Sequence, residues 1–154
     1  MASQFDDMHD NEAIGVTLSD QSIYAPSPGN EQKGFRRAEL QFKYDENRIY
    51  PPYSIGKTTF HWSIRKDQAR PLNLSHEYQL VFLEDSSYST NQVVLKTGNI
   101  YPATGLKPDS LVLLGNVNSK PVPQLFNTSF TADVWHNFAV TMDFDKKYAA
   151  LLTQ

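Results

Sequence analysis

Two stretches of the chain, Phe35–Tyr44 and His76–Leu83, each combine a glutamate with basic or amide side chains. Polar and apolar residues alternate in both stretches, so the polar side chains are expected to share one face of a strand. Glu39 lies on that face in the first stretch and Glu77 in the second. Two such carboxylates, set among groups that bind hydroxyls, could perform acid and base chemistry on a sugar. A solvated strand face with cross-strand ion pairs would show the same pattern.

Other catalytic and metal-binding patterns are absent from the sequence. There is no Cys, which excludes a disulfide framework, a thiolate zinc site and a Cys nucleophile. The four His residues show neither HExxH nor HxH spacing, and there is no phosphate-binding glycine loop and no GxSxG motif. We therefore expect neither a metal nor a cofactor. Glu84 and Asp85 follow the Glu77 segment in an EDSS sequence and are interpreted as turn residues.

The elements that must position the two glutamates are expected to be strands. Alternation is strict over Thr58–Lys66, where Phe60, Trp62 and Ile64 form the apolar face. Over Glu77–Leu83 the same pattern places Tyr78, Leu80 and Phe82 opposite Glu77, Gln79 and Val81. Further strands are expected over Gln92–Lys96, Ser110–Leu114 and Val134–Asp143, with weaker candidates at Ile14–Leu18 and Ser22–Tyr24. Short strands separated by turn signals, without helices between them, predict an all-β fold, an antiparallel sandwich or barrel.

Length and charge restrict the function further. The chain of 154 residues is the size of one domain, and its net charge of −3 does not favour nucleic acid as a partner. No apolar run approaches the roughly 20 residues of a membrane helix, so a membrane is not expected either. Residues 1–12 are polar and are interpreted as a disordered lead-in, followed by a single domain over residues 13–154. Two glycosylation sequons, at Asn73 and Asn127, slightly favour a secretory origin.

Three longer segments resemble a known family. They are GFRRAEL (Gly34–Leu40), RPLNLSHEYQLVFLED (Arg70–Asp85) and GNVNSKP…FTADVWHNFAVTMDFD (Gly115–Asp145). The chain is similar to the catalytic domain of glycoside hydrolase family 131, a group of secreted fungal β-glucanases. The resemblance implies a β-jelly roll and hydrolysis of β-glucans, with exo action on β-1,3 and β-1,6 linkages and endo action on β-1,4 linkages. It implies a polysaccharide or oligosaccharide as the partner, an extracellular location and no catalytic metal; a monomer is expected.

The resemblance also implies roles for particular residues. Glu39, in the FRRAE motif, and Glu77, in the HEYQ motif, match the catalytic glutamates of the family. Substrate-binding positions are expected at Arg36, Arg37, His76, Gln79 and His136. The family suggests inversion of configuration, which requires carboxyl groups roughly 6.5–9.5 Å apart. Because Arg37 is expected beside Glu39 and would favour its charged form, Glu39 is interpreted as the base and Glu77 as the acid.

The chain also departs from the family pattern. It is shorter than the family's catalytic domains, it begins without a signal peptide, and its ending KKYAALLTQ differs from the family continuation. A jelly roll truncated at both ends, and therefore incomplete, is expected. Two other interpretations stay open. One is a non-catalytic carbohydrate-binding sandwich with Trp62, Tyr78 or Trp135 as aromatic platforms. The other is an inactive truncated fragment.

Overall fold

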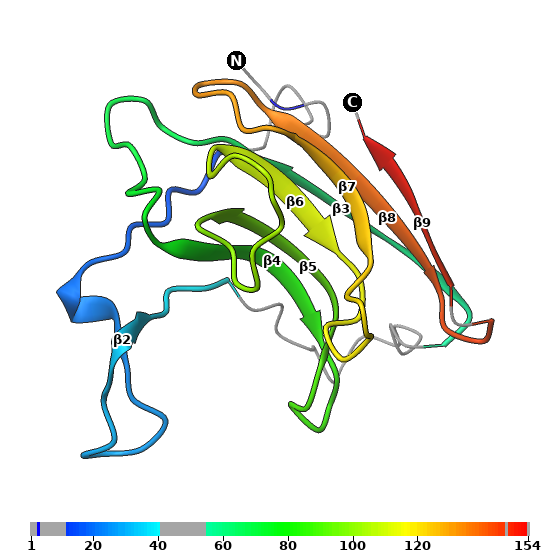
Figure 1. Ribbon diagram of the computed structural model, residues 1–154, viewed down its shortest axis with the longest axis horizontal. Coiled ribbons are helices and arrows are strands. Elements are labelled where there is room, and N and C mark those ends of the chain that lie inside the picture. The colour runs from blue at the N-terminus through cyan, green and yellow to red at the C-terminus, as the bar shows by residue number, and fades with distance from the viewer. Residues whose placement is uncertain (1–2, 4–11, 41–54, 147, 154) are drawn as a thin grey trace. The chain divides into compact units, whose positions relative to one another are not determined.

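Antiparallel strands make up almost all of the regular structure (Figure 1). The computed structural model describes residues 3, 12–40, 55–146 and 148–153. These residues belong to two units, a larger one of Met1–Phe5 and Ser54–Gln154 and a smaller one of Asp6–Tyr53. Among the described residues the larger unit contains the strands β3 (Lys57–Ile64), β4 (Glu77–Glu84), β5 (Asn91–Gly98), β6 (Ser110–Leu114), β7 (Gln124–Ser129), β8 (His136–Asp143) and β9 (Tyr148–Thr153). The smaller contains β1 (Ile23–Tyr24) and β2 (Gln32–Arg36).

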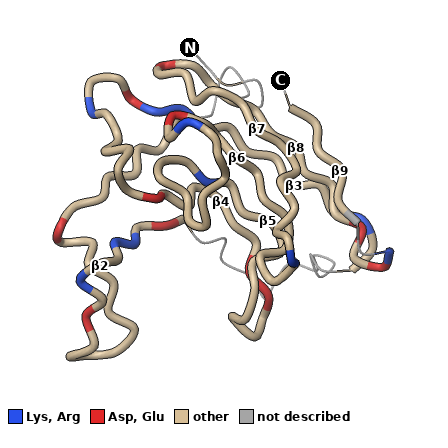
Figure 2. Tube along the Cα trace, viewed as in Figure 1, with Lys and Arg blue, Asp and Glu red and all other residues tan. Residues whose placement is uncertain are grey.

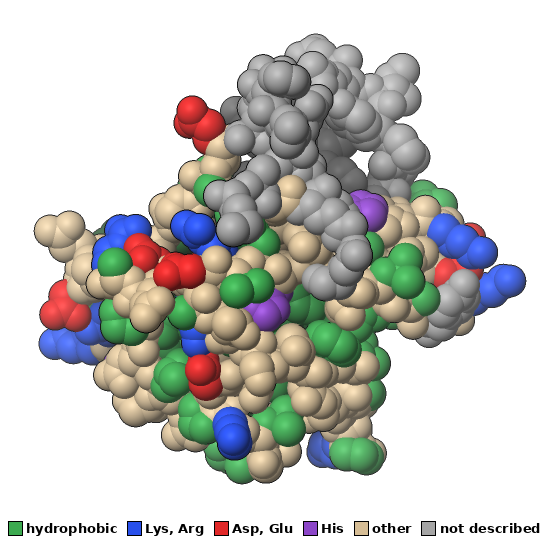
Figure 3. All heavy atoms as spheres, turned by 90° about the horizontal axis from the view of Figure 1, so that it is seen from above, with side chains coloured by type: hydrophobic (Ala, Val, Ile, Leu, Met, Phe, Trp, Pro, Cys, Tyr) green, Lys and Arg blue, Asp and Glu red, His purple; other side chains and the backbone are tan. Residues whose placement is uncertain are grey.

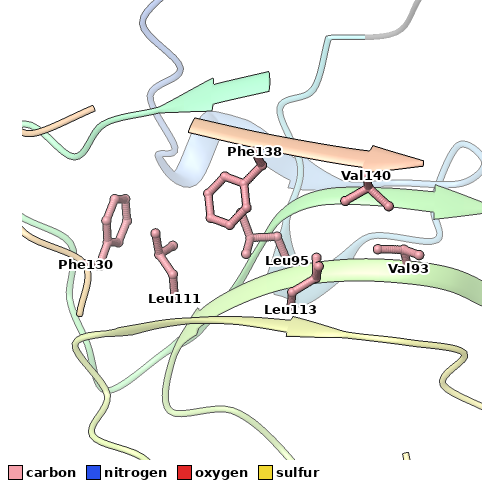
Figure 4. Close-up of a cluster of buried hydrophobic side chains, with 7 residues drawn as sticks. All are labelled: Val93, Leu95, Leu111, Leu113, Phe130, Phe138 and Val140. Carbon is pink, nitrogen blue, oxygen red and sulfur yellow. The ribbon is translucent and has the colours of Figure 1, made fainter. Parts of the chain in front are cut away.

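The larger unit is a sandwich of two antiparallel sheets. One sheet has the order β3-β8-β9 and the other has the order β4-β5-β6-β7. Their facing surfaces enclose one core cluster, shown in Figure 4, which consists of Val93, Leu95, Leu111, Leu113, Phe130, Phe138 and Val140. Burial of each such side chain stabilises the fold by about 1.5–3 kcal/mol, so this cluster holds the two sheets together. The all-β antiparallel sandwich predicted from the sequence is confirmed.

The four-stranded sheet also has apolar residues on its second face. Side chains alternate along β5 and β6, so Val94, Val112 and Leu114 point away from the three-stranded sheet. They form a second cluster with Ile100, and residues of the loops that follow β5 and β6 pack against it. Charged residues are rare in these strands and gather in the turns (Figure 2). The loop residues thus cover part of the second face of this sheet. A charged group in the covered part needs a partner of opposite charge.

The strand β4 departs from its sequence pattern at one point. Its pairing with β5 shifts between Gln79 and Val81, where a β-bulge inserts one extra residue. Beyond the bulge the alternation changes sides. Val81 packs on the inter-sheet core with Leu80, whereas Phe82 stays exposed. The prediction that Phe82 shares a face with Tyr78 and Leu80 is therefore wrong.

The strand expected over Phe35–Tyr44 is also placed differently. The observed strand β2 ends at Arg36, and residues 37–40 continue without strand structure, while residues 41–44 lie outside the described residues. A strand needs a partner backbone, and β1 supplies only two residues, because the 3₁₀ turn Asp20–Ser22 precedes it. The pairing ends where the Arg37 N–H donates to the Ser22 carbonyl at 2.8 Å.

The remaining expected strands are present in part. Ser110–Leu114 and most of Val134–Asp143 are strands as predicted, whereas Ile14–Leu18 is not. The strands β7 and β9 have no counterpart among the strands expected from the sequence. Residues of the expected lead-in 1–12 lie outside the described residues, apart from Ser3 and Glu12.

In the described part of the chain, no helix is long and apolar enough to span a membrane. On the face seen in Figure 3, hydrophobic side chains appear in small groups among polar and charged ones.

Candidate active site

Glu77 is held at the first residue of β4 by two donors. The Lys96 Nζ atom donates to its Oε1 atom at 2.9 Å, and the Tyr101 N–H donates to its Oε2 atom at 2.8 Å. Lys96 is on β5, on the same face as Val94, so Glu77 lies on the second face of the four-stranded sheet and not in the inter-sheet core. The Lys96 side chain is 10% exposed and that of Glu77 is 25% exposed. The carboxylate is thus fixed in position and still reachable from solvent.

The chain around Glu77 is fixed by a close backbone approach. Asn99 N–H donates to the His76 carbonyl at 2.9 Å, directly beside Gly98. Gly98 has a φ of +86°, and a Cβ atom there would lie 1.9 Å from the His76 oxygen. Only glycine fits this position, both for its backbone angle and for the space available. The end of β5 therefore packs directly on the residue that precedes Glu77.

The neighbours of Glu77 along the chain have different surroundings. His76 and Gln79 are exposed, and the His76 ring lies 6.5 Å from that of Tyr78. Tyr78 is half-buried, and its hydroxyl bonds to the backbone of Asn73. His76 and Gln79 are thus near Glu77 in the chain and accessible, whereas Tyr78 serves to close the turn before β4.

Glu39 lies in the smaller unit and is bound by Arg37. The guanidinium donates from Nε to Oε2 at 2.8 Å and from Nη2 to Oε1 at 2.6 Å. These hydrogen bonds raise the pKa of Arg37 above its ordinary value. The guanidinium also lies 5.1 Å from the centre of the Tyr24 ring. The contact expected between Arg37 and Glu39 is therefore present, although the two residues are not on a strand.

Arg36 turns away from this pair to other partners in the same unit. It bonds to Asp20 at 2.6 Å and to the Lys33 carbonyl. Arg36 and Arg37 thus bind different carboxylates of the smaller unit.

His136 begins β8 and faces the core between the sheets. Its ring lies 5.5 Å from that of Phe130, edge to face, and its Nε2 atom is buried without a hydrogen-bond partner among the described residues. Burial is the main cause that lowers the pKa of His136; a backbone hydrogen bond at Thr131 opposes it, and the charge of Lys66 adds to it. Glu77 is on the opposite face of the four-stranded sheet, so the structure does not bring His136 and Glu77 together.

The structure adds two residues to the site that are not among those expected from the sequence. Lys96 and Tyr101 are the partners of Glu77. The sequence does indicate that Lys96 needs a partner, because this cation directly follows the apolar run Val93–Leu95. A cation in a buried strand needs a carboxylate beside it. The sequence does not indicate the role of Tyr101, since its contact with Glu77 is made by its backbone N–H.

Two other acidic groups, Asp85 and Asp143, make hydrogen bonds within turns. Asp85 accepts hydrogen bonds from the backbone and side chains of Ser87 and Ser89, and these bonds lower its pKa. Asp143 is 3% exposed and caps the turn by accepting from the Lys146 N–H at 2.8 Å. Within the described ranges, no group of three His, Asp or Glu side chains could hold a metal ion.

A small hollow near the start of the β3–β4 connection is separate from Glu77. Its volume is about 130 Å³, below the roughly 300–1,000 Å³ of ligand pockets. The residues that line it are Lys66, Asp67, Gln68, Pro71, Leu72, Leu74 and Ala132. Glu77 does not line this hollow, so the accessible surface beside Glu77 is the better candidate site.

The fold and the site define the class of the protein. It is an all-β, antiparallel sandwich with a fixed, accessible carboxylate on one sheet face. The chain belongs to glycoside hydrolase family 131, since the model of the "Glycoside hydrolase 131 catalytic N-terminal domain" matches residues 1–153. The family resemblance carried by the FRRAE and HEYQ motifs is confirmed.

Solved structures agree with this assignment. The catalytic domain of a glycoside hydrolase family 131 protein from Coprinopsis cinerea is 27% identical, with a TM-score of 0.51 over 67% of this chain and 37% of that chain. A GH131 β-glucanase catalytic domain from Podospora anserina is 24% identical, with a TM-score of 0.51 over 66% of this chain and 38% of that chain, and shows the fold. The alignments thus span little more than a third of each neighbour. Comparison with curated proteins gives no match.

Proposed function

We propose that the chain hydrolyses β-glucans and that Glu39 and Glu77 are its catalytic residues. The observation that carries the proposal is the geometry of Glu77, which two donors hold at 2.8 and 2.9 Å while a quarter of its side chain stays exposed. A catalytic carboxylate needs this combination, because it must be positioned within about 0.5 Å and still reach the glycosidic oxygen or a water molecule. The family assignment supplies the reaction class.

The proposal extends to the course of the reaction. One glutamate donates a proton to the leaving oxygen while the other activates water, with inversion at the anomeric carbon. The linkages proposed are β-1,3 and β-1,6 by exo action and β-1,4 by endo action. Arg36, Arg37, His76 and Gln79 are proposed to bind the sugar hydroxyls. His136 is proposed to bind substrate only on the evidence of its motif, because its ring faces the core.

The roles of acid and base depend on the cations that lie beside the two glutamates. The interpretation of Glu39 as the base rests on Arg37, which is expected to favour the charged form of Glu39. In the structure Glu77 has a cation of its own, Lys96, at 2.9 Å. Because each glutamate is paired, charge no longer distinguishes the two roles, and the assignment of Glu39 as base is a proposal for a pH profile to decide.

The experiment measures the release of reducing sugar from β-1,3-, β-1,6- and β-1,4-glucans. Glu77→Gln and Glu39→Gln are each expected to reduce kcat by at least 10²-fold, since acid–base catalysis contributes about 10²–10⁴-fold. Glu84→Gln, an exposed glutamate at the opposite end of β4, is the matched control and should keep full activity. Circular dichroism of each variant confirms folding, and Glu77→Asp, which keeps the charge but withdraws the carboxylate, provides a second test.

Several outcomes distinguish the alternatives. The variant that loses the basic limb of the pH–activity profile identifies the acid, and the anomer first detected by NMR shows inversion or retention. Binding of glucan without sugar release would favour the carbohydrate-binding sandwich. Failure of the chain to give a cooperative unfolding transition would favour the inactive fragment. We propose secretion for this chain as for its family; glycan on Asn73 or Asn127 after expression in a secreting host would support it.

A further inference from the structure

The loop that follows β5 contains an exposed tyrosine, Tyr101, whose backbone contacts Glu77. Tyr101 is 84% exposed, whereas its neighbour Ile100 is 7% exposed and packs in the second cluster. The Tyr101 N–H is the group that donates to Glu77 at 2.8 Å. One residue therefore fixes the carboxylate through its backbone and turns its side chain to solvent.

The backbone of this loop is tied down on both sides of Tyr101. Asn99 N–H donates to the His76 carbonyl, Ile100 N–H to the Gly98 carbonyl, and Gly98 N–H to the Pro108 carbonyl, all within 3.0 Å. Leu106, further along the loop, packs on the second cluster. The ring of Tyr101 is thus exposed on a well-anchored segment, so it can bind a ligand without the cost of ordering a loop.

The exposure of Tyr101 has no explanation in the fold itself. Tyr24 and Tyr78 are half-buried, the first against Phe35 and the second bonded to Asn73. The Tyr101 ring makes no aromatic, cation–π or hydrogen-bond contact with the residues that the structure describes. Tyr88 is comparably exposed, at 81%, but it lies in the β4–β5 turn at the opposite end of β4 from Glu77.

We propose that Tyr101 is a sugar-binding platform on which a β-linked glucosyl ring stacks next to Glu77. A tyrosine ring offers a rigid apolar face with only two side-chain torsions to order, and its hydroxyl can bond to a sugar hydroxyl. The axial C–H groups of a β-glucosyl ring form a flat apolar face that matches it. The proposal rests on the proposed function, because the glucan is the ligand.

The aromatic platforms expected from the sequence do not take this role in the structure. Trp62 stacks on Phe138 at 5.5 Å, towards the inter-sheet core. Trp135 lies beneath the Arg65 guanidinium at 5.4 Å. Trp62, Tyr78 and Trp135 are each partly buried, whereas Tyr101 is exposed and its backbone contacts Glu77, so Tyr101 is the better placed of the four to receive a sugar ring.

The test compares Tyr101→Ala and Tyr101→Phe with the control Tyr88→Ala. The substitutions keep the backbone N–H that bonds Glu77 and change an exposed side chain, so folding should be preserved. Titration calorimetry with a β-1,3- and a β-1,4-linked glucan tetraose measures Kd, and reducing-sugar assays measure KM and kcat. Tyr101→Ala should raise Kd and KM about 3- to 10-fold, in line with the worth of one aromatic contact, with kcat changed less than twofold. Tyr101→Phe keeps the ring and loses only the hydroxyl, so its Kd and KM should lie between those of the native chain and Tyr101→Ala, whereas Tyr88→Ala should stay within twofold of the native chain.

The outcomes separate this proposal from the proposed function. If Tyr101→Ala weakens tetraose binding while the native chain releases no sugar, the platform stands and hydrolysis fails. If the native chain hydrolyses glucan but Tyr101→Ala has the KM and Kd of Tyr88→Ala, the platform is overturned and hydrolysis stands. A fall in kcat without a change in Kd would also overturn the platform, because the Tyr101 side chain would then act on Glu77 and not on sugar binding. Absence of tetraose binding by the native chain overturns the platform as well.

Discussion

The ion pair between Lys96 and Glu77 should make the two residues unequal in their effect on stability. Lys96 lies on β5, on the same face as Val94 and opposite Val112 of β6, and both valines are fully buried. The Lys96 side chain is 10% exposed. Glu77 is 25% exposed and keeps a second donor, the Tyr101 N–H. Removal of the carboxylate therefore leaves a cation that water barely reaches. Removal of the cation leaves a carboxylate that is still partly hydrated and hydrogen-bonded.

The magnitude follows from these exposures. An exposed ion pair is worth about 0.2–1 kcal/mol, and loss of one partner from a fully buried pair costs about 3–5 kcal/mol. This pair lies between the two limits, so Glu77→Gln should lower the free energy of unfolding by about 2 kcal/mol. Lys96→Met should lower it by about 1 kcal/mol, since the methionine also packs with apolar neighbours. The double variant should be more stable than Glu77→Gln alone, because no unpaired ammonium remains.

Urea denaturation of the native chain, both single variants and the double variant measures these differences as shifts of the midpoint at unchanged slope. The double-mutant cycle should yield a coupling of about 1–2 kcal/mol. Glu84→Gln, on the same strand, is the control and should change stability by less than about 0.5 kcal/mol. A coupling near zero, or a Lys96→Met variant less stable than Glu77→Gln, would refute the reasoning about the buried ammonium.

Three further substitutions test the close packing at Gly98 and the burial of His136. Gly98→Ala should unfold the end of β5 or abolish soluble expression, because its Cβ would meet the His76 oxygen at 1.9 Å; Gly105→Ala, also at positive φ but with nothing within 4 Å, should cost only about 1–2 kcal/mol in urea denaturation. Equal costs for the two variants would show that strain, not space, decides the position. His136 should make the chain less stable in acid: since burial lowers its pKa in the folded state, the unfolded state takes up the proton first, and stability falls as the pH drops below the ordinary value of 6.5. His136→Gln should flatten the dependence of the urea midpoint between pH 7 and 5, and an unchanged slope would remove His136 as its cause.

Much of the larger unit could be predicted from local pattern. Thr58–Lys66 corresponds to β3, and its apolar face packs as expected, with Trp62 and Ile64 on the inter-sheet core. The residues of such a strand specify it by themselves, because apolar residues at every second position all point to the same face of the sheet and are buried there. Ser110–Leu114 is apolar after its first residue, and its burial on both faces explains that run.

The errors occur where a partner strand decides the structure. Tyr148–Thr153 contains Ala and Leu, which favour helix, but it pairs with β8 over six positions. Phe35–Tyr44 alternates well, yet its strand ends at Arg36, where the short β1 has no more backbone to offer. The bulge in β4 likewise arises from the pairing of β4 with β5, and neither strand alone predicts it.

By itself, the sequence determined the all-β class, the family and the two candidate glutamates, because these depend on residue types at fixed spacing within single segments. The tertiary structure decided which groups surround Glu77. Lys96 and Tyr101 are 19 and 24 residues away in the chain, and only the antiparallel register of β4 and β5 and the loop that follows it bring them to the carboxylate. Contacts across a sheet depend on register and on bulges, which are set by the packing of both faces and leave no mark in either segment alone.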